Sequence, residues 1–290
     1  MKLLRIAGLS MFLLSAIAFA GYRGYEISRN DEAGPLIEFD SDEVTAGVKV
    51  TEEELLKNVT AYDEKDGDVT ASLLIESISD FISSGQRIIT YAAFDSNNNI
   101  TKRERKLIYT DYKSPRFSLK RPLRFTVGDT ANILEYMEVW DCIDGDLSEN
   151  IKYEEPDYNF GTTEDTYQIT FQVTNSAGDT AYLPAEIEFY YMEKSAPEIL
   201  LSKYLIYLKV GEAFHPEAYI EGVSINQKKY GIMENSILQS GRPDNTIPRK
   251  DISISSNVNI RKPGVYQAEY SMTAQNGNRG RTKLLVVVEE

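Results

Sequence analysis

The chain has 290 residues, of which 42% are hydrophobic and 11% aromatic, and its formal net charge at pH 7 is −14. This length suits two or three domains of ordinary size, and the apolar fraction excludes a chain that is disordered throughout. The negative charge argues against nonspecific nucleic-acid binding over the whole surface, so nucleic acid is not an expected partner. Cys142 is the only cysteine, which excludes an intrachain disulfide.

The first 22 residues predict a signal peptide or a membrane anchor. Lys2 and Arg5 precede an apolar run that ends in Ala18-Phe19-Ala20. A basic start, an apolar centre and a small-x-small ending are typical of a secretory signal. Without cleavage, the apolar run 6–22 lies at the lower limit of a bilayer span of about 20 residues. Both alternatives stay open, and both predict an extracytoplasmic protein that is secreted or anchored by its N-terminus.

Three copies of one pattern follow this segment. Each copy opens with a proline before alternating apolar residues, and proline suits the first residue of an edge strand. These prolines are Pro35, Pro115 and Pro197. Later in each copy, apolar and polar residues alternate around an aromatic residue, which indicates a strand with one buried face. These aromatic residues are Tyr91, Phe171 and Tyr270.

Each of these late strands is followed by a turn-forming segment and a last strand, as in a hairpin. Many short strands with regular turns predict an all-β protein of three tandem immunoglobulin-like β-sandwiches, preceded by one N-terminal apolar export or anchor helix. The third copy is longer, and its surplus at 226–250 has the composition of an inserted loop. The expected divisions are 1–22 (signal peptide or anchor), 23–34 (linker), 35–112, 113–194 and 195–290 (three Ig-like domains).

The stretch Asn58–Thr70, with Gly85–Tyr91 and Asp95-Ser96, resembles the bacterial Ig-like domains related to hyalin repeats. One group of these domains is named after a repeat in an insecticidal crystal toxin. The second copy matches again at Asp141–Leu147 and Asn175–Gly178, whereas the third matches only loosely. The resemblance implies a sandwich in a surface protein, acting as a spacer or adhesive module. It implies no ligand.

The motif Asp-x-x-Asp-Gly-Asp occurs in the first and the second copy. Three carboxylates within six residues repel one another unless they are solvated or neutralised, and Ca²⁺ would neutralise them. The alternative is an Asp-Gly turn whose carboxylates accept hydrogen bonds from local N–H groups. Calcium is therefore the one cofactor that the sequence suggests. The candidate ligands are Asp63, Asp66, Asp68, Asp141, Asp144 and Asp146.

Two basic segments are candidate interaction sites. Lys120, Arg121 and Arg124 belong to a cationic stretch, 102–124, that could attract an anionic envelope polymer or lipid head groups. The alternative is a solvated strand whose charges are split between two faces and pair with acidic neighbours. In the insert, Lys228, Lys229 and Tyr230 could contact a partner, or the insert could be a disordered excursion.

Catalysis has little support in the sequence, and we expect no enzyme. His215 is the only histidine, which removes most hydrolytic schemes. Trp140, the only tryptophan, is either a sugar-stacking platform or a core residue. We expect an exported, cell-surface or membrane-tethered protein whose partners are envelope or extracellular proteins or polysaccharides, with the membrane added if the N-terminus is uncleaved. The alternative is a carbohydrate- or calcium-binding receptor that uses the Asp-rich turns and the 226–250 loop.

Overall fold

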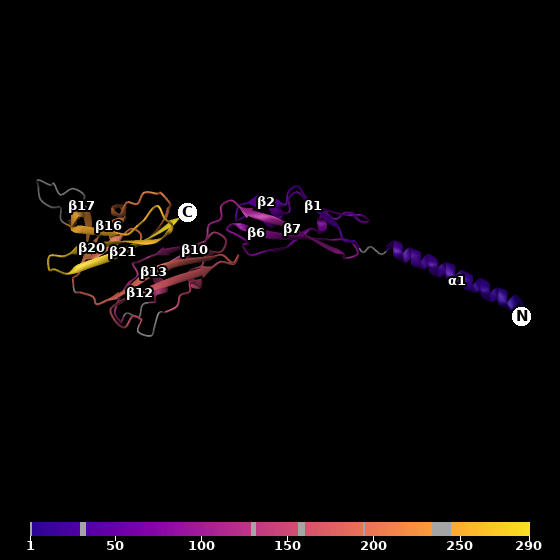
Figure 1. The fold of residues 1–290 in the computed structure, drawn as a ribbon, viewed down its shortest axis with the longest axis horizontal. Helices are drawn as coiled ribbons and strands as arrows, with labels where there is room; N and C mark the ends of the chain where they lie inside the picture. The colour runs from indigo at the N-terminus through magenta and orange to yellow at the C-terminus, as the bar shows by residue number, and fades with distance from the viewer. Residues whose placement is uncertain (1, 30–32, 129–131, 156–159, 194, 234–244) are drawn as a thin grey trace. The chain divides into compact units, whose positions relative to one another are not determined.

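The computed structural model describes residues 2–29, 33–128, 132–155, 160–193, 195–233 and 245–290. The chain folds mostly into strands in several sheets, with few helices, which confirms the all-β class (Figure 1). It divides into two compact units, Met1–Tyr112 and Lys113–Glu290. Three buried apolar cores lie within these units, one in the first and two in the second.

The chain begins with helix α1 (Lys2–Arg29). Residues 23–29, expected as part of a linker, are therefore helical. Large apolar side chains of α1 are exposed, among them Met11 at 75% and Phe12 at 70%. In the part of the chain that the structure describes, no helix meets the length and apolarity that crossing a membrane requires. An export or anchor role for α1 stays a prediction.

The first sandwich packs a three-stranded sheet, β1-β3-β4, against a four-stranded sheet, β2-β7-β6-β5. A short helix, α2 (Glu52–Leu55), begins at a capping box in which Thr51 and Glu54 exchange hydrogen bonds with each other's backbone. The strands are β1 (Leu36–Phe39), β2 (Glu43–Ala46), β3 (Val59–Asp63), β4 (Gly67–Asp68), β5 (Leu74–Ile78), β6 (Gln86–Phe94) and β7 (Ile100–Tyr109).

The second sandwich repeats this plan with the sheets β11-β10-β8 and β12-β13-β9. Its late strand shows the alternation that the sequence predicts, because Tyr167, Ile169, Phe171 and Val173 are buried and the residues between them are exposed. The strands are β8 (Arg116–Leu119), β9 (Arg124–Thr126), β10 (Met137–Asp141), β11 (Gly145–Asp146), β12 (Asp165–Thr174) and β13 (Thr180–Tyr190).

The third sandwich packs β14-β16-β17-β18 against β15-β21-β20-β19. Its strands are β14 (Glu198–Leu201), β15 (Leu205–Lys209), β16 (Ile220–Ile225), β17 (Lys228–Met233), β18 (Thr246–Pro248), β19 (Ile252–Ser256), β20 (Gly264–Thr273) and β21 (Arg279–Glu289). Single turns of 3₁₀ helix also occur in the chain, at Thr70–Ser72, Ile133–Tyr136, Ser148–Asn150, Pro216–Tyr219 and Arg249–Asp251.

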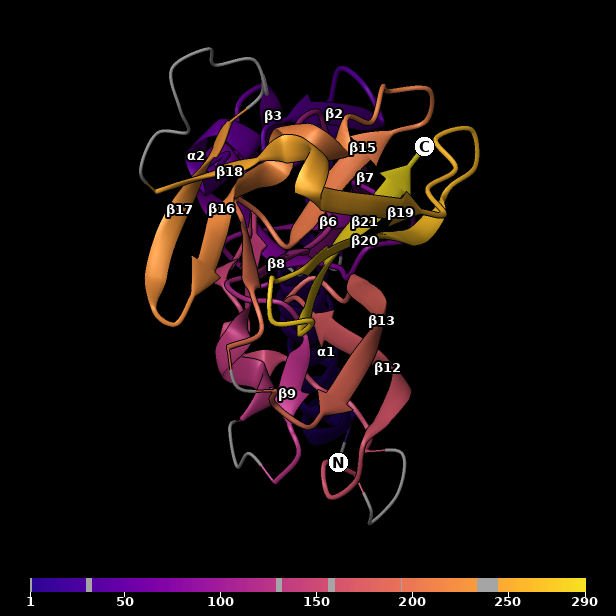
Figure 2. The same cartoon turned by 90° about the vertical axis from the view of Figure 1, so that its left-hand side faces the viewer.

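The insert differs from the expected loop, because two of its segments are strands that widen one sheet. Asn226 and Gln227 have positive φ and form the turn from β16 into β17, which pairs antiparallel with β16. β18 then pairs parallel with β17, and Figure 2 shows the three strands side by side. Residues 234–244 of the insert lie outside the described residues.

All three sandwiches share one topological feature. The second strand of each copy runs parallel to the last strand, as β2 with β7, β9 with β13 and β15 with β21. The last two strands of each copy form the antiparallel hairpin expected from the turn residues between them. The third copy therefore keeps the plan of the first two despite its weaker sequence resemblance.

The aromatic landmark of each copy lies at the centre of a core. Tyr91, Phe171 and Tyr270 are all 0% exposed. The hydroxyl of Tyr91 donates to the carbonyl oxygen of Leu55 at 2.8 Å, and that of Tyr270 donates to the carbonyl oxygen of Pro216 at 2.8 Å. Burial raises the pKa of both hydroxyls, so they stay neutral donors.

We expect Tyr270→Phe to lower the free energy of unfolding by about 1 kcal/mol, because it removes a buried donor and leaves the Pro216 carbonyl without it. The phenyl ring itself should fit, since Phe171 fills the corresponding place in the second sandwich. Urea unfolding of the full chain measures the change. Tyr182→Phe, at a tyrosine that is 61% exposed, is the control and should have no effect. An unchanged midpoint for Tyr270→Phe would contradict the assignment.

Candidate functional site

The first Asp-rich turn joins the two sheets of its sandwich. Oδ1 of Asp63, which is 2% exposed, accepts hydrogen bonds from the backbone N–H groups of Lys65 and Asp66 at 2.8 and 2.9 Å. Asp66 then accepts from the backbone N–H and the hydroxyl of Ser96 at 2.7 and 3.0 Å. Because Ser96 lies in the β6–β7 turn, these bonds tie the end of β3 to the opposite sheet.

The second turn repeats this geometry. Oδ1 of Asp141 accepts from the N–H groups of Ile143 and Asp144, both at 2.8 Å. Asp144 accepts from the backbone N–H and the hydroxyl of Ser176, both at 2.6 Å. Asn175 adds one more bond, from its side-chain amide to Oδ2 of Asp141 at 3.2 Å. We call the Asp66–Ser96 and Asp144–Ser176 contacts the inter-sheet latches.

The last carboxylate of each motif caps the turn that follows it. Hydrogen bonds from Thr70 hold the pKa of Asp68 below its ordinary value, and hydrogen bonds from Ser148 do the same for Asp146. These contacts are those of the Asp-Gly turn alternative. Among the residues that the structure describes, no group of three or more His, Cys, Asp or Glu side chains could hold a metal ion. Calcium binding at these turns stays a prediction.

We expect Asp144→Ala to lower the stability of the chain by about 1 kcal/mol in buffer with a calcium chelator, because Ser176 loses its acceptor without any metal being involved. Asp66→Ala should behave alike through Ser96. Glu149→Ala, at an exposed residue of the 3₁₀ turn that follows β11, is the matched control. Thermal unfolding with chelator and with millimolar Ca²⁺ separates the two interpretations. A cost for Asp144→Ala that appears only with Ca²⁺ would favour the metal site.

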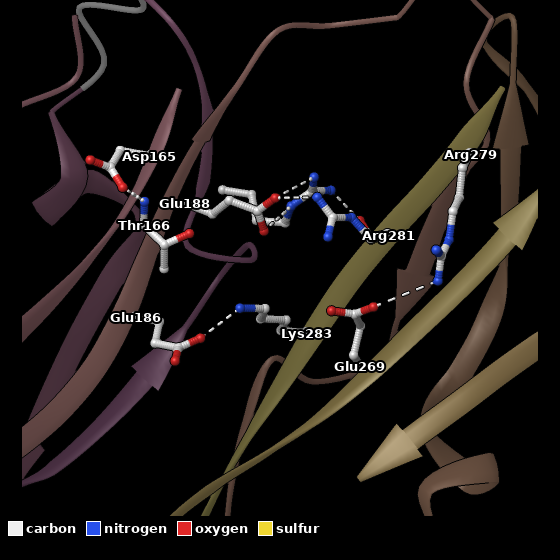
Figure 3. A network of polar contacts seen from close by, with 9 residues as sticks. Asp165, Thr166, Glu186, Glu188, Glu269, Arg279, Arg281 and Lys283 are labelled. Atoms are coloured by element: carbon white, nitrogen blue, oxygen red, sulfur yellow. Dashed lines mark hydrogen bonds and ion pairs between the residues drawn. The ribbon is translucent and has the colours of Figure 1, made fainter. Parts of the chain in front are cut away.

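A separate group of charged residues connects the second sandwich to the third (Figure 3). The carboxylate of Glu188 lies between two arginines, with Oε2 2.9 Å from Nε of Arg124 and Oε1 2.7 Å from Nη2 of Arg281. The side chains of Glu188 and Arg124 are only 8% and 12% exposed. Arg124 and Glu188 come from the second sandwich and Arg281 from the third, so one carboxylate holds both together.

Further polar contacts lie on both sides of this triad. Lys283 pairs with Glu186 at 2.6 Å, and Arg116 pairs with Glu289. Burial alone would raise the pKa of Glu186, but its hydrogen bonds, chiefly from Lys283, outweigh that effect and leave the pKa below the ordinary value of 4.5. This contact therefore stabilises the fold above about pH 4.5 and is lost as the pH falls through the lowered pKa.

Apolar packing accompanies the charges. Leu205 and Leu285 of the third sandwich belong to the same buried cluster as the core of the second. The hydroxyl of Tyr207 accepts a hydrogen bond from the N–H of Phe117 at 3.0 Å, and burial raises the pKa of Tyr207 to about 12. We call these polar and apolar contacts together the joint.

The joint was missed in the sequence, although β21 carried a signal for it. Strand residues alternate between two faces, so a strand buried on one face reads as alternating. Leu284–Val288 is instead a continuous apolar run, which indicates burial on both faces. Leu284, Val286 and Val288 fill the core of the third sandwich, while Leu285 and Val287 face the second.

The basic candidates are placed differently from an open cationic patch. Arg124 belongs to the joint, so it does not form part of an exposed binding surface. Lys120 pairs with Glu138 at 2.9 Å, and the guanidinium of Arg121 lies 5.6 Å from the centre of the Tyr136 ring. Lys120 and Arg124 thus pair with acidic residues, as in the alternative, but Lys120 and Arg121 lie in the bend between β8 and β9, and Arg124 is largely buried.

The insert candidates lie together on β17. Lys228 and Lys229 are exposed, whereas Tyr230 is half-buried against the core of the third sandwich. The ammonium group of Lys228 lies 5.3 Å from the centre of the Tyr230 ring. A role in partner binding stays a prediction for all three.

Trp140 is not a core residue, because 67% of it is exposed on β10. His215 is exposed too, just before a 3₁₀ turn at Pro216–Tyr219. Two hollows of about 450 and 520 Å³ lie in the first sandwich, both remote in sequence from His215. The larger is lined by Glu38, Phe39, Asp40, Asn58, Thr60 and Arg103.

No family model matches the chain. An uncharacterized 81.3 kDa protein of Acholeplasma phage L2 is 24% identical over 184 residues, which are 63% of this chain. The chain spans only 22% of the length of that relative. This likeness shows no family and brings no function with it.

Solved structures resemble the chain only remotely. The structure of CBM51-2 in complex with GlcNAc and INT domains, from Clostridium perfringens ZmpB, is 15% identical with a TM-score of 0.22 and covers 51% of this chain and 26% of its own. The protocadherin GammaB4 extracellular domain is 12% identical with a TM-score of 0.21 and covers 89% and 50%. Drosophila N-cadherin EC1-4 is 10% identical with a TM-score of 0.20 and covers 90% and 77%. Superpositions this poor carry no argument.

We expect Glu188→Gln to cost about 3 kcal/mol of stability, because Arg124 would keep its charge in a largely buried place without a counter-ion. Glu186→Gln, two residues away on the same face of β13, is the matched control. The Lys283–Glu186 pair is more exposed than the Arg124–Glu188 pair and should contribute about 1 kcal/mol or less. Urea unfolding gives both values, and limited proteolysis near residues 190–198 reports on opening of the joint. A loss for Glu188→Gln no larger than for Glu186→Gln would contradict this.

Proposed function

We propose that the chain is an exported, non-enzymatic surface protein whose immunoglobulin-like sandwiches act as spacer and adhesive modules. The observation that supports this best is the joint. The second and third sandwiches pack against each other through their sheet surfaces. Glu188 lies between Arg124 and Arg281, and Leu205 and Leu285 extend the core of the second sandwich. A fixed pair of domains suits a protein that holds a binding face at a distance.

A non-enzymatic role is supported by the composition of the site candidates. The buried carboxylates Asp63 and Asp141 accept hydrogen bonds from their own turns, and Glu188 neutralises two arginines. These groups are already engaged in structural contacts, whereas catalysis needs acids and bases that face a substrate.

Export is supported by the N-terminal sequence and by the exposure of α1. Large apolar side chains such as Met11, Phe12 and Leu14 meet water in the isolated chain, which is unfavourable at roughly 25 cal/mol per Å² of apolar surface. Insertion into a lipid bilayer, or removal after Ala20, would relieve this cost. The anchored and the secreted form are both consistent with the proposal.

A carbohydrate-binding receptor is the second candidate function. Trp140 favours it, because its ring is exposed on a rigid strand rather than buried. The Asp-rich turns favour it less, since their carboxylates already accept hydrogen bonds within the fold.

Export is tested by producing the full chain in a bacterium and determining where it resides. We expect it in the membrane fraction with an intact N-terminus, or released with a new N-terminus after Ala20, and mass spectrometry of that end separates the two. Leu13→Arg with Leu14→Arg should hold the chain in the cytosol, since each charge at the centre of the apolar run costs about 3 kcal/mol on insertion. Leu36→Arg, at an exposed position outside α1, is the control. A wild-type chain that stays cytosolic and uncleaved would contradict export.

A further inference from the structure

Trp140 has an unusual position for the only tryptophan of the chain. It lies on the outward face of β10, where its neighbours in register are Asp146 on β11 and Arg116 on β8. Its indole reaches across the turn to Gly145, where an added Cβ would lie 3.8 Å from Cη2. A flat aromatic surface is therefore supported by the backbone of a tight turn and remains 67% exposed.

The same arrangement occurs in the first sandwich. Tyr62 takes the corresponding position on β3, opposite Asp68 on β4, and is 60% exposed. Two copies of the fold thus present an outward aromatic residue beside the last carboxylate of the Asp-rich turn. In the third sandwich the corresponding place on β16 belongs to Ser224, which pairs with Lys229 of β17, so no aromatic residue stands there.

Polar groups able to exchange hydrogen bonds surround the indole. The hydrogen bonds of Asp146 from Ser148 both end on Oδ1, at 2.9 and 2.5 Å, and the residue is exposed, so Oδ2 is available as an acceptor. The same bonds hold the pKa of Asp146 below its ordinary value, so it remains ionised near neutral pH. Glu138, two residues before Trp140 on the same face, pairs with Lys120 with both side chains about half exposed. Such a pair contributes little and can be exchanged for a ligand.

These features fit a sugar better than a protein. A stable protein interface buries roughly 1,200–2,000 Å², whereas this face offers one aromatic side chain within a charged rim. A pyranose ring covers an indole, places weakly positive C–H groups on the negative face of the ring, and has hydroxyls that both donate and accept. The rim holds both signs of charge, as Asp146 and Glu138 with Lys120, so it does not select an ion.

We propose that the outward face of β10 and β11, centred on Trp140 and Asp146, binds the neutral pyranose units of a glycan. The inference rests on the proposed adhesive function, of which it names the ligand class. Trp140 supplies the stacking surface, and Oδ2 of Asp146 accepts from a sugar hydroxyl. Tyr62 and Asp68 form the corresponding, weaker face of the first sandwich, so a repeating polymer could be bound at two places along the chain.

The single tryptophan makes the full chain its own reporter. Cellohexaose, chitohexaose and mannohexaose are titrated to about 10 mM, a range suited to the weak affinity of one stacked ring, while tryptophan emission is followed. We expect at least one of the three to change the emission saturably. No change with any of them would overturn the proposal, and this measurement on the unmodified chain does not depend on whether a variant folds.

Variants then locate the binding site on the protein. Each variant is run in native gels that contain the polymer of the responding sugar, and its retardation relative to a gel without the polymer measures binding. Trp140→Ala should weaken retardation about tenfold or more and Asp146→Asn about threefold or more, as expected for loss of stacking and of a charged acceptor. Tyr182→Ala removes an equally exposed aromatic residue from β13 and should stay within about twofold of wild type, since exposed contacts outside the site contribute little. Retardation that survives Trp140→Ala would overturn the site. If the unmodified chain reaches the cell surface but binds none of the sugars, only this inference is overturned. If the chain stays in the cytosol, the proposed function is overturned.

Discussion

The burial of β21 on both faces is the constraint on which the second unit depends. Its alternate residues Leu284, Val286 and Val288 fill the core of the third sandwich. The residues between them face the second sandwich, and Arg281, at the start of the strand, meets Glu188. Separating the two sandwiches would expose apolar surface and leave the Glu188–Arg124 pair without its third member. The strand therefore belongs to two cores at once, which explains why residues 113–290 form one compact unit.

Charge and apolar contact have different tasks in this joint. Burying a carboxylate with two guanidinium groups costs desolvation that their attraction does not always recover, whereas Leu205 and Leu285 gain free energy wherever they are buried. Apolar packing alone would tolerate sliding of one sheet over the other. The contacts of Glu188 have fixed donors at fixed distances, and Lys283–Glu186 repeats the condition two residues further along β21. The charges thus specify one alignment of the two sheets, while the leucines provide the strength.

The inter-sheet latches show how two sandwiches of a chain with one cysteine connect their sheets without a disulfide. Asp66 and Asp144 each accept two hydrogen bonds from a serine of the opposite sheet. The carboxylates are held in place because their neighbours Asp63 and Asp141 are buried and satisfied by local N–H groups. The third sandwich has no such Asp motif in its sequence, and its corresponding sheet is one strand wider, with β18 added beside β17. Two different devices thus stabilise the same topology.

The cores could be predicted from the sequence, because a strand with one buried face alternates apolar and polar residues, as Tyr167 to Val173 do. This alternation is visible within a single strand, without knowledge of its neighbours. It could not predict Arg124 as an internal residue, since its partner Glu188 is 64 residues away and nothing local distinguishes that arginine from Lys120. The sequence left Trp140 open between the core and the surface, because an aromatic residue favours the core on average whereas its position in the alternation of the strand decides which face it occupies. Val139 and Asp141 are buried on β10, so Trp140 between them must point outward. The alternation of β10 therefore predicts an exposed ring at position 140, whereas residue type alone favours a buried one. The alternation thus points to the candidate binding face.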